Sequence, residues 1–220
     1  MQPLRIVILL HEADDFYQKT RYLLRTIVDI WTAQGHAVEL VGGPDRFVPA
    51  DVVIPHLDLT VTPERYRALL DRYPVVVNRH LLDIAKSRIS AQLVNRRDPW
   101  RGPVIVKTDR NYGGKPEARL GSPPSVAPQP TRSLLRRAHS CVQVEPPPPQ
   151  LRGLLREHGV DYGKIGYVLH DGEIVLFDVN RTPGSGAPID RQLSEVFAQR
   201  LAAGLEGFIH GAAAAGAVRR

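Results

Sequence analysis

The chain has 220 residues, of which 43% are hydrophobic and 24% are charged, and its net charge at pH 7 is +6. No apolar run approaches the roughly 18 residues that a transmembrane helix needs, so the composition indicates a soluble globular protein without a membrane partner. The length allows one large domain or two small ones. A single cysteine, Cys141, excludes an internal disulfide and a cysteine-based zinc site. The first ten residues resemble a strand more than a signal peptide, which predicts a cytoplasmic location.

The first 78 residues alternate between the periodicities of strands and helices. Apolar strands are predicted at residues 4–10, 37–41, 51–54 and 75–77. Helical spacing covers residues 16–31, closed by Gly35, and a second helix is predicted after Thr62 as N-cap with Pro63 at its first position. This order predicts a small, parallel, doubly wound sheet of the Rossmann-like kind. No GxGxxG follows the first strand, so the dinucleotide fingerprint is absent.

Polar residues follow two of these strands where the strands end. Ligands of parallel sheets gather at the carboxyl ends of the strands, so these residues are candidates for a substrate site. Capping of the following helices is the alternative interpretation. The residues are His11, Glu12, Asp14 and Asp15 after the first strand and His56 and Asp58 after the third.

The centre of the chain carries two lysines in apolar contexts. An amphipathic helix is predicted over residues 81–94, with Lys86 beside its apolar stripe. A buried strand, residues 104–107, ends in Lys107, and a loop with Gly113 and Gly114 follows. Glycines let backbone N–H groups approach phosphate oxygens closely, so the sequence predicts a phosphate site here. Nine prolines between residues 116 and 149 predict a linker.

Regular structure resumes after the linker. A short helix is predicted over residues 150–158, an antiparallel hairpin over 164–170 and 173–179, and a helix from residue 189 to 208 with a frayed alanine-rich tail after Gly211. Asp178 and Asn180 alternate with apolar residues, so both leave the same face of the second hairpin strand. Carboxylate and amide oxygens are ligands that Mg²⁺ accepts.

The positive charge is concentrated in the centre of the chain. Residues 79–137 contain 13 Lys and Arg against four Asp and Glu. Such a region predicts a polyanionic partner, which is a nucleotide or, less favoured because no nucleic-acid motif accompanies it, a nucleic acid. A solvated basic surface is the third interpretation.

These motifs, in this order, resemble those of the ATP-grasp superfamily, the ligases that activate a carboxylate as an acyl phosphate for attack by an amine or another nucleophile. The resemblance implies ATP and Mg²⁺ as cofactors. By it, Lys86, Lys107, Asn111, Gly113 and Gly114 would contact the nucleotide, and Asp178 and Asn180 would hold magnesium. It implies an α/β chain with an N-terminal domain at 1–78, a lysine helix, strand and glycine loop at 79–118, a proline-rich linker at 119–149, and a truncated α+β ATP-grasp domain at 150–220.

The chain departs from the family pattern at two places. Gly166 stands where the family usually has an acidic metal ligand, and Asp161 replaces it only if the chain bulges. The long segment that usually carries the adenine hinge is reduced to the proline-rich stretch, in which only residues 142–145 resemble a hinge strand. The nucleotide cleft would therefore be open on one side.

Three functions follow from these observations. In an active ligase, Lys164 would face the transferred phosphate, and Arg79 or Arg181 would pair with a small carboxylate substrate. In a catalytically reduced relative, the chain would be a nucleotide-binding or protein-interaction module, with a homodimer able to supply the missing wall. Nucleic-acid binding by the basic centre ranks third.

Overall fold

The computed structural model describes residues 2–15, 17, 22–90, 92–95, 97–102, 104, 106–121, 148–184 and 191–217. Within them lie eleven helices and strands, in addition to a single 3-10 turn, η1 (Asn111–Gly114). The N-terminal half contains β1 (Arg5–Leu10), α2 (Leu23–Ala33), β2 (Ala37–Gly42), β3 (Val52–His56) and α3 (Glu64–Leu70). The remainder contains α4 (Lys86–Ile89), α5 (Lys115–Arg119), α6 (Pro149–Glu157), β4 (Lys164–His170), β5 (Glu173–Asn180) and α7 (Arg191–Ala217).

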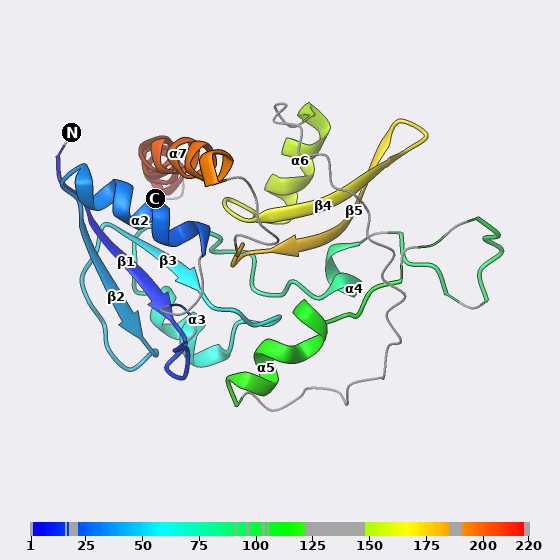
Figure 1. Cartoon of the computed structure of the whole chain (residues 1–220), viewed down its shortest axis with the longest axis horizontal. Coiled ribbons are helices and arrows are strands. Elements are labelled where there is room, and N and C mark those ends of the chain that lie inside the picture. Colours follow the sequence, from blue (N-terminus) through cyan, green and yellow to red (C-terminus); the bar gives the residue numbers. More distant parts are fainter. Residues whose placement is uncertain are drawn as a thin grey trace.

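The fold is mixed α/β, with a three-stranded parallel sheet and a separate two-stranded antiparallel sheet. The parallel sheet has the strand order β2-β1-β3, and Val76 adds a parallel bridge to Val53 at its edge. Successive residues of β1 face opposite sides, as expected for a strand buried on both faces. Figure 1 shows α2 and α7 on one side of this sheet and α3 on the other. The small parallel sheet is predicted correctly, but the strand expected at residues 75–77 is reduced to the single bridge of Val76.

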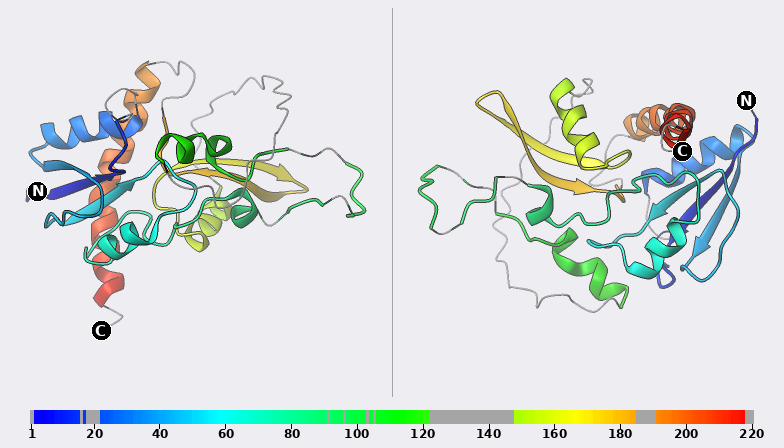
Figure 2. Two further views of the ribbon diagram at one scale, coloured as in Figure 1. Left: turned by 90° about the horizontal axis from the view of Figure 1, so that it is seen from below. Right: turned by 180° about the vertical axis from the view of Figure 1, so that it is seen from behind.

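Two hydrophobic cores cover the two faces of the parallel sheet. On one face, Ile6 and Ile8 of β1 pack with Leu24 and Ile27 of α2 and with Leu205 of α7. The other face buries Val7 and Leu9 against Tyr66 and Leu69 of α3. The views in Figure 2 show α7 crossing the strands at a steep angle. The last helix of the chain therefore completes the core that the first strand begins.

The antiparallel sheet is the hairpin of β4 and β5, as predicted. Its register pairs Lys164 with Asn180 and Gly166 with Asp178, and it shifts between Gly166 and Tyr167. A third core buries Leu176 and Val179 of β5 against Ile84 and Ile89. The hairpin thus lies over the segment that carries Lys86.

The helix predicted over residues 81–94 is wrong for most of its length, because only Lys86–Ile89 is helical. The residues before Lys86 instead form backbone hydrogen bonds with residues 60–62. Thr62 N donates to Leu82 O at 2.8 Å, and Ile84 N donates to Thr60 O at 2.9 Å. The backbone N–H of a residue cannot form both this hydrogen bond and the hydrogen bond of a continuous helix. After Ile89 the helix is lost, and Leu93 and Val94 are exposed.

The strand predicted over residues 104–107 is also not found in the part of that range that the structure describes. Residues 104, 106 and 107 belong to no strand, and Val106 is 80% exposed. An apolar run forms a strand only where another strand offers hydrogen bonds, and no described residue pairs with it here. The described residues of 92–102 instead lie in an arm that extends from the body of the molecule (Figure 1).

Smaller corrections concern helix ends. α2 begins at Leu23, and residues 16 and 18–21 of the helix predicted over 16–31 lie outside the described residues. The N-cap of α3 is Pro63 rather than Thr62. α6 and the hairpin match their predicted ranges within a residue or two. α7 continues through Gly211 to Ala217, where fraying was expected. The linker predicted over 119–149, the hinge-like residues 142–145 and Cys141 lie wholly or mostly outside the described residues. No helix in the described ranges has the length and apolar character to cross a bilayer.

Asn78 joins the parallel sheet to the start of the hairpin. Its side-chain Oδ1 accepts hydrogen bonds from the backbone N of Asp161 (2.8 Å) and of Tyr162 (3.0 Å), and its Nδ2 donates to Tyr162 O at 2.8 Å. In return, the Asp161 carboxylate accepts from Asn78 N at 2.6 Å. The φ of Asn78 is 58°, a left-handed conformation that asparagine tolerates better than most residues.

We expect Asn78→Ala to lower the free energy of unfolding by about 1–3 kcal/mol, because two partly buried N–H groups lose their acceptor and the left-handed backbone loses a tolerant residue. Equilibrium urea denaturation measures the change. Asn95→Ala, at an exposed position of the arm, is the matched control and should change stability by less than about 0.5 kcal/mol. Equal stability of the two variants would contradict the role given to Asn78.

Candidate functional site

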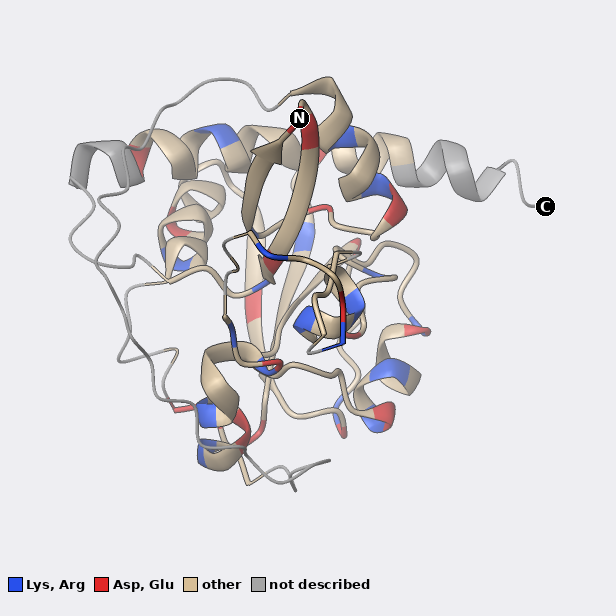
Figure 3. Cartoon of the chain, turned by 90° about the vertical axis from the view of Figure 1, so that its right-hand side faces the viewer, with Lys and Arg blue, Asp and Glu red and all other residues tan. Residues whose placement is uncertain are grey.

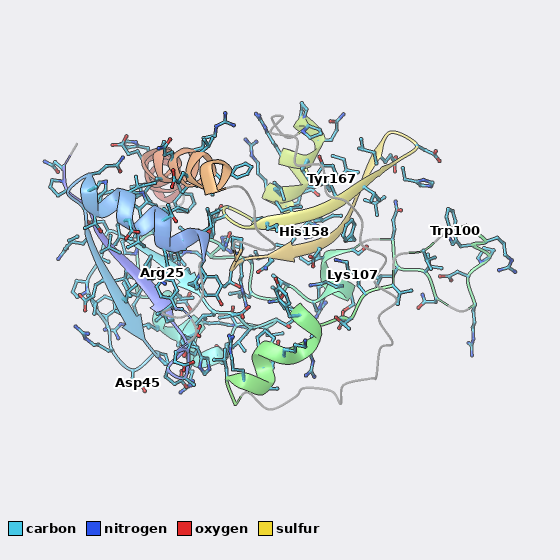
Figure 4. All side chains as sticks on the ribbon, viewed as in Figure 1. Arg25, Asp45, Trp100, Lys107, His158 and Tyr167 are labelled. Carbon is cyan, nitrogen blue, oxygen red and sulfur yellow. The ribbon has the colours of Figure 1, made fainter. Side chains whose placement is uncertain are left out.

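Two lysines from different segments converge on one carboxylate. Lys86 Nζ, at the start of α4, lies 2.8 Å from Asp178 Oδ1, and Lys107 Nζ lies 3.5 Å from Asp178 Oδ2. Lys107 also lies over the ring of Phe177, 4.8 Å from its centroid. Figure 4 shows Lys107 beside α4 and below the hairpin. The Lys86 side chain is 11% exposed and that of Asp178 is 31% exposed, so the cluster is half-buried but reachable from solvent. The structure therefore brings together three predicted site residues.

Asp109 holds the two lysine-bearing segments together, and sequence reasoning missed it. Its backbone O accepts a hydrogen bond from Lys86 N at 3.0 Å, and its Oδ1 accepts from Ser87 N at 2.8 Å. A carboxylate that accepts N–H groups of the first turn stabilises a short helix. The only signal in the sequence was an acid two residues after Lys107, which does not reveal its partner. Asp109 thus joins the chain just after Lys107 to the first turn of α4, which carries Lys86.

The predicted glycine loop forms the turn η1, which leads into α5. Tyr112, Gly113 and Gly114 have φ values of 46°, 69° and 79°, three consecutive left-handed residues. Such a run favours glycine and turns the chain sharply after Lys107. Tyr112 is 66% exposed at the turn. The turn lies downstream of the lysine, as predicted for a loop that approaches phosphates.

Asn111 faces away from solvent, into a buried polar layer between the sheet and the hairpin. Its backbone N donates to Thr60 Oγ1 at 2.9 Å, and its Nδ2 donates to Asp58 Oδ1 at 3.1 Å. Thr182 Oγ1 donates to the same Asp58 oxygen at 3.0 Å, and Arg119 pairs with the other oxygen at 3.1 Å. Desolvation by burial raises the pKa of Asp58, against the hydrogen bond from Thr182 and the charge of Arg119. Asn111 therefore anchors the glycine loop and does not offer its amide to a ligand in this arrangement.

The other polar residues at the carboxyl ends of the strands are largely held by neighbours. Glu12 contacts Arg65 and the Tyr66 hydroxyl. His56 is 1% exposed and packs edge-on against the ring of Tyr22, with centroids 4.5 Å apart. Burial lowers the pKa of His56 to about 3, so its imidazole is neutral at physiological pH. These contacts support a structural role for the cluster more than a substrate site.

The side chain of Asn180 is hydrogen-bonded to Thr182, two residues later. Its Oδ1 accepts a hydrogen bond from Thr182 N at 2.9 Å, and the Thr182 hydroxyl, whose single proton is donated to Asp58, lies 3.1 Å from the same oxygen. The oxygen that would coordinate a metal ion is therefore already bonded within the turn. Asn180 therefore stabilises the turn after β5.

Gly166 has no room for a side chain. A Cβ placed there would lie 2.7 Å from Phe177 Cε2 and 3.1 Å from Asp178 Cβ. The register shift beside it brings Phe177 into this position. Asp161 does not take its place, since its carboxylate is bonded to Asn78 N. No carboxylate therefore takes the place of the metal ligand that the resemblance would put at position 166.

The residues present do not fit a resident magnesium ion. Mg²⁺ requires octahedral oxygen ligands, and Asp178 is already paired with two ammonium groups while Asn180 is bonded to Thr182. The described residues contain no group of three or more His, Cys, Asp or Glu able to hold a metal ion. The charge of the cluster is instead suited to an anion.

The three residues predicted to be catalytic do not form a substrate-binding arrangement with Lys86 and Lys107. Arg79 donates to Tyr73 O at 2.6 Å and lies 3.9 Å from Asp71. Lys164 is exposed opposite Asn180 in the hairpin. Arg181 is 4% exposed, and its guanidinium is hydrogen-bonded inside the protein.

The guanidinium of Arg181 is a buried clamp on three separate segments. Its NH1 donates to Thr62 Oγ1 and to Leu81 O, both at 2.8 Å, and its NH2 donates to Leu59 O at 2.7 Å. Burial lowers the pKa of Arg181 to about 10, so the side chain remains charged at neutral pH. A guanidinium so engaged cannot also bind a substrate carboxylate bidentately.

We expect Arg181→Met to lower the free energy of unfolding by about 2–5 kcal/mol, because two buried carbonyls and a hydroxyl lose their donor. Arg88→Met, whose guanidinium is 76% exposed, is the matched control and should be nearly neutral. Chemical denaturation of both variants provides the comparison. A loss of ligand binding by Arg181→Met with no loss of stability would instead assign Arg181 to a substrate.

Restoring a carboxylate at position 166 should destabilise the fold. We expect Gly166→Asp to lower the melting temperature by an amount that corresponds to about 1–3 kcal/mol, because the new side chain collides with Phe177, and Mg²⁺ should not restore it. Adding Phe177→Leu should recover most of the loss.

The control for Gly166→Asp is Gly153→Asp in α6, where a Cβ would meet nothing within 4 Å. That variant should keep the parent melting temperature. A strong stabilisation of Gly166→Asp by Mg²⁺ would show that the position can complete a metal site.

Comparison of this chain with protein-family models, with curated proteins and with solved structures finds no match in any of the three.

Proposed function

We propose that this chain is a nucleotide-binding module that holds the phosphates of ATP between Lys86 and Lys107. The observation that carries the proposal is the convergence of both ammonium groups on the single carboxylate of Asp178. Two cations and one anion leave a net positive site, and a triphosphate offers more oxygens to the lysines than Asp178 does. The turn at Tyr112–Gly114 follows Lys107 in the chain, but the N–H of Gly113 is bonded to Arg110 O at 3.2 Å, so the two lysines carry the proposed phosphate contacts.

The resemblance to the ATP-grasp superfamily supports the same proposal. The Rossmann-like parallel sheet, the two lysines and the late hairpin with Asp178 occur in the order that the resemblance implies. Magnesium would enter with the nucleotide as a Mg-ATP complex, because the protein provides too few free oxygens to retain it alone. Asp178 would then exchange its lysine partners for that complex.

We favour the catalytically reduced relative over the active ligase. The arginines expected to bind a carboxylate are engaged elsewhere, Arg79 with backbone carbonyls and Arg181 in the buried clamp. Gly166 offers no metal ligand and has no space for one. Acyl-phosphate chemistry would need both, since charge on the transferred phosphate must be neutralised and the acceptor must be oriented.

Nucleic-acid binding is less well supported. In the described part of the basic centre, several positive side chains have an acidic partner: Lys86 and Lys107 with Asp178, and Arg119 with Asp58. Figure 3 shows acidic residues interspersed among the basic ones along the ribbon. These acids offset part of the positive charge, and the two lysines converge on one point, which suits a compact polyphosphate better than an extended nucleic-acid backbone.

We expect Lys86→Met and Lys107→Met each to weaken ATP binding about 10- to 100-fold, because each removes a charge-assisted contact to phosphate. Isothermal titration calorimetry with ATP, with and without Mg²⁺, measures the affinity. The matched control is Lys115→Met, at an exposed lysine of α5, which should bind ATP as the parent does. No ATP binding by the parent at millimolar concentration would refute the proposal.

Asp178→Asn separates the possible roles of the carboxylate. If Asp178 competes with phosphate for the lysines, this variant binds metal-free ATP about 3- to 10-fold more tightly than the parent. Weaker binding of Mg-ATP by the same variant would instead assign Asp178 to the metal. Release of phosphate that requires a carboxylic acid, measured on the parent protein, would promote the ligase function over the binding module.

A further inference from the structure

The first strand of the hairpin, β4, has an edge with no strand beside it in the part of the chain that the structure describes. There the antiparallel sheet consists of β4 and β5 alone. Val168 and Leu169 point to opposite faces of β4 and are 39% and 65% exposed, so neither face is covered near the turn. The turn of the hairpin projects from the body of the molecule (Figure 1). An open edge of this kind is a template for pairing with another strand.

The register of the hairpin determines which backbone groups lie at this open edge. Asp171 and Gly172 both have positive φ, 50° and 81°, as in a two-residue turn, so the flanking residues 170 and 173 form a hydrogen-bonded pair. Hydrogen-bonded and non-hydrogen-bonded pairs alternate from there, so every second residue of β4 directs its N–H and C=O outwards. Among the described residues, no hydrogen bond reaches these outward groups from beyond the hairpin. The outward-facing residues are Ile165, Tyr167 and Leu169.

The irregularity of the hairpin lies on the other strand. The register changes from Gly166–Asp178 to Tyr167–Leu176, so Phe177 is the extra residue and the bulge belongs to β5. A bulge in an edge strand hinders pairing with a new strand. β4 therefore keeps its regular alternation over all seven of its residues, Lys164–His170.

The sequence of β4 is complementary to itself when two copies run antiparallel. Lys164 is exposed at the start of the strand, and Asp171, which is 90% exposed, follows its end, 3.6 Å from the His170 imidazole. A two-fold axis at Tyr167 places Lys164 of each copy opposite His170 and beside Asp171 of the other. It also sets Ile165 opposite the exposed Leu169. Parallel pairing in register would instead place like charges side by side.

We propose that this chain forms a homodimer in which the β4 strands of two copies pair antiparallel about a two-fold axis at Tyr167. The result is a four-stranded sheet in the order β5-β4-β4-β5. Trp100, whose ring lies 5.8 Å from that of His170, adds aromatic surface where Lys164 of the other copy arrives. A single strand pair is a small interface, so the dimer is reversible, with a dissociation constant of about 10–100 µM.

The first test measures the mass of the chain by sedimentation equilibrium without nucleotide. The parent should pass from monomer to dimer between about 1 and 200 µM. Leu169→Lys should weaken the dimer at least about 10-fold, because an edge lysine opposes strand pairing. The matched control is Leu40→Lys, at a leucine that is 39% exposed on β2, an edge strand of the other sheet. This control should dimerise as the parent does.

Cysteine crosslinking tests the register, in a Cys141→Ser background because Cys141 is the only cysteine. At the two-fold axis, Tyr167→Cys meets its own copy at a Cα separation of about 5.5 Å, within reach of a disulfide. Leu169→Cys lies about 14 Å from its copy, beyond that reach. Mild oxidation followed by non-reducing electrophoresis should therefore give a crosslinked dimer for Tyr167→Cys alone.

Circular dichroism and melting temperatures establish that each variant is folded. The proposal is overturned by a parent that stays monomeric at 200 µM, by a dimer that Leu40→Lys weakens as much as Leu169→Lys does, or by crosslinking of Leu169→Cys in place of Tyr167→Cys. Because Lys86 and Lys107 contact β5 and nucleotide is left out, each of these outcomes is independent of ATP binding.

Discussion

A buried cation holds the two sheets of this protein together. Arg181 follows β5 directly, and its guanidinium reaches Leu59, Thr62 and Leu81. Beside it, Asp58 receives hydrogen bonds from both Asn111 and Thr182. Polar groups removed from water must find partners, so this layer permits very few alternative arrangements of the segments that it joins. It therefore determines where β5 lies, and with it the carboxylate of Asp178 over Lys86 and Lys107.

That arrangement makes the lysine cluster a site with an internal competitor. Without a ligand, Asp178 neutralises part of the positive charge and keeps both ammonium groups ordered. In the proposed function a phosphate would replace this carboxylate, so its affinity would reflect the difference between two ionic interactions and not the full strength of either. The competitor also limits binding of weaker anions such as single carboxylates, which favours ligands with several phosphate oxygens.

The parts of the fold that depend on local periodicity were predictable from the sequence. The three parallel strands, α6, the hairpin and the common face of Asp178 and Asn180 follow from patterns of two and 3.6 residues. The helix expected over residues 81–94 does not form over most of that range, because residues 82–84 form backbone hydrogen bonds with the segment around Val61. Sequence periodicity carries no information about that tertiary partner. For the same reason the roles of Arg181 and Asp109 could not be seen. An arginine or aspartate has the same local signature on a surface as in a buried layer, and only the tertiary contacts distinguish the two.

The position of α7 has a consequence for how the chain folds. The face of β1 that contains Ile6 and Ile8 is covered by Ala202 and Leu205, nearly 200 residues later in the sequence. The contact from Trp31 to Ala202 spans 171 residues. Contacts of such separation require closure of a long loop and form slowly compared with local ones. During synthesis, the first strands and α2 therefore emerge with an uncovered apolar face, and this face stays available to chaperones or to aggregation until the last helix has been made.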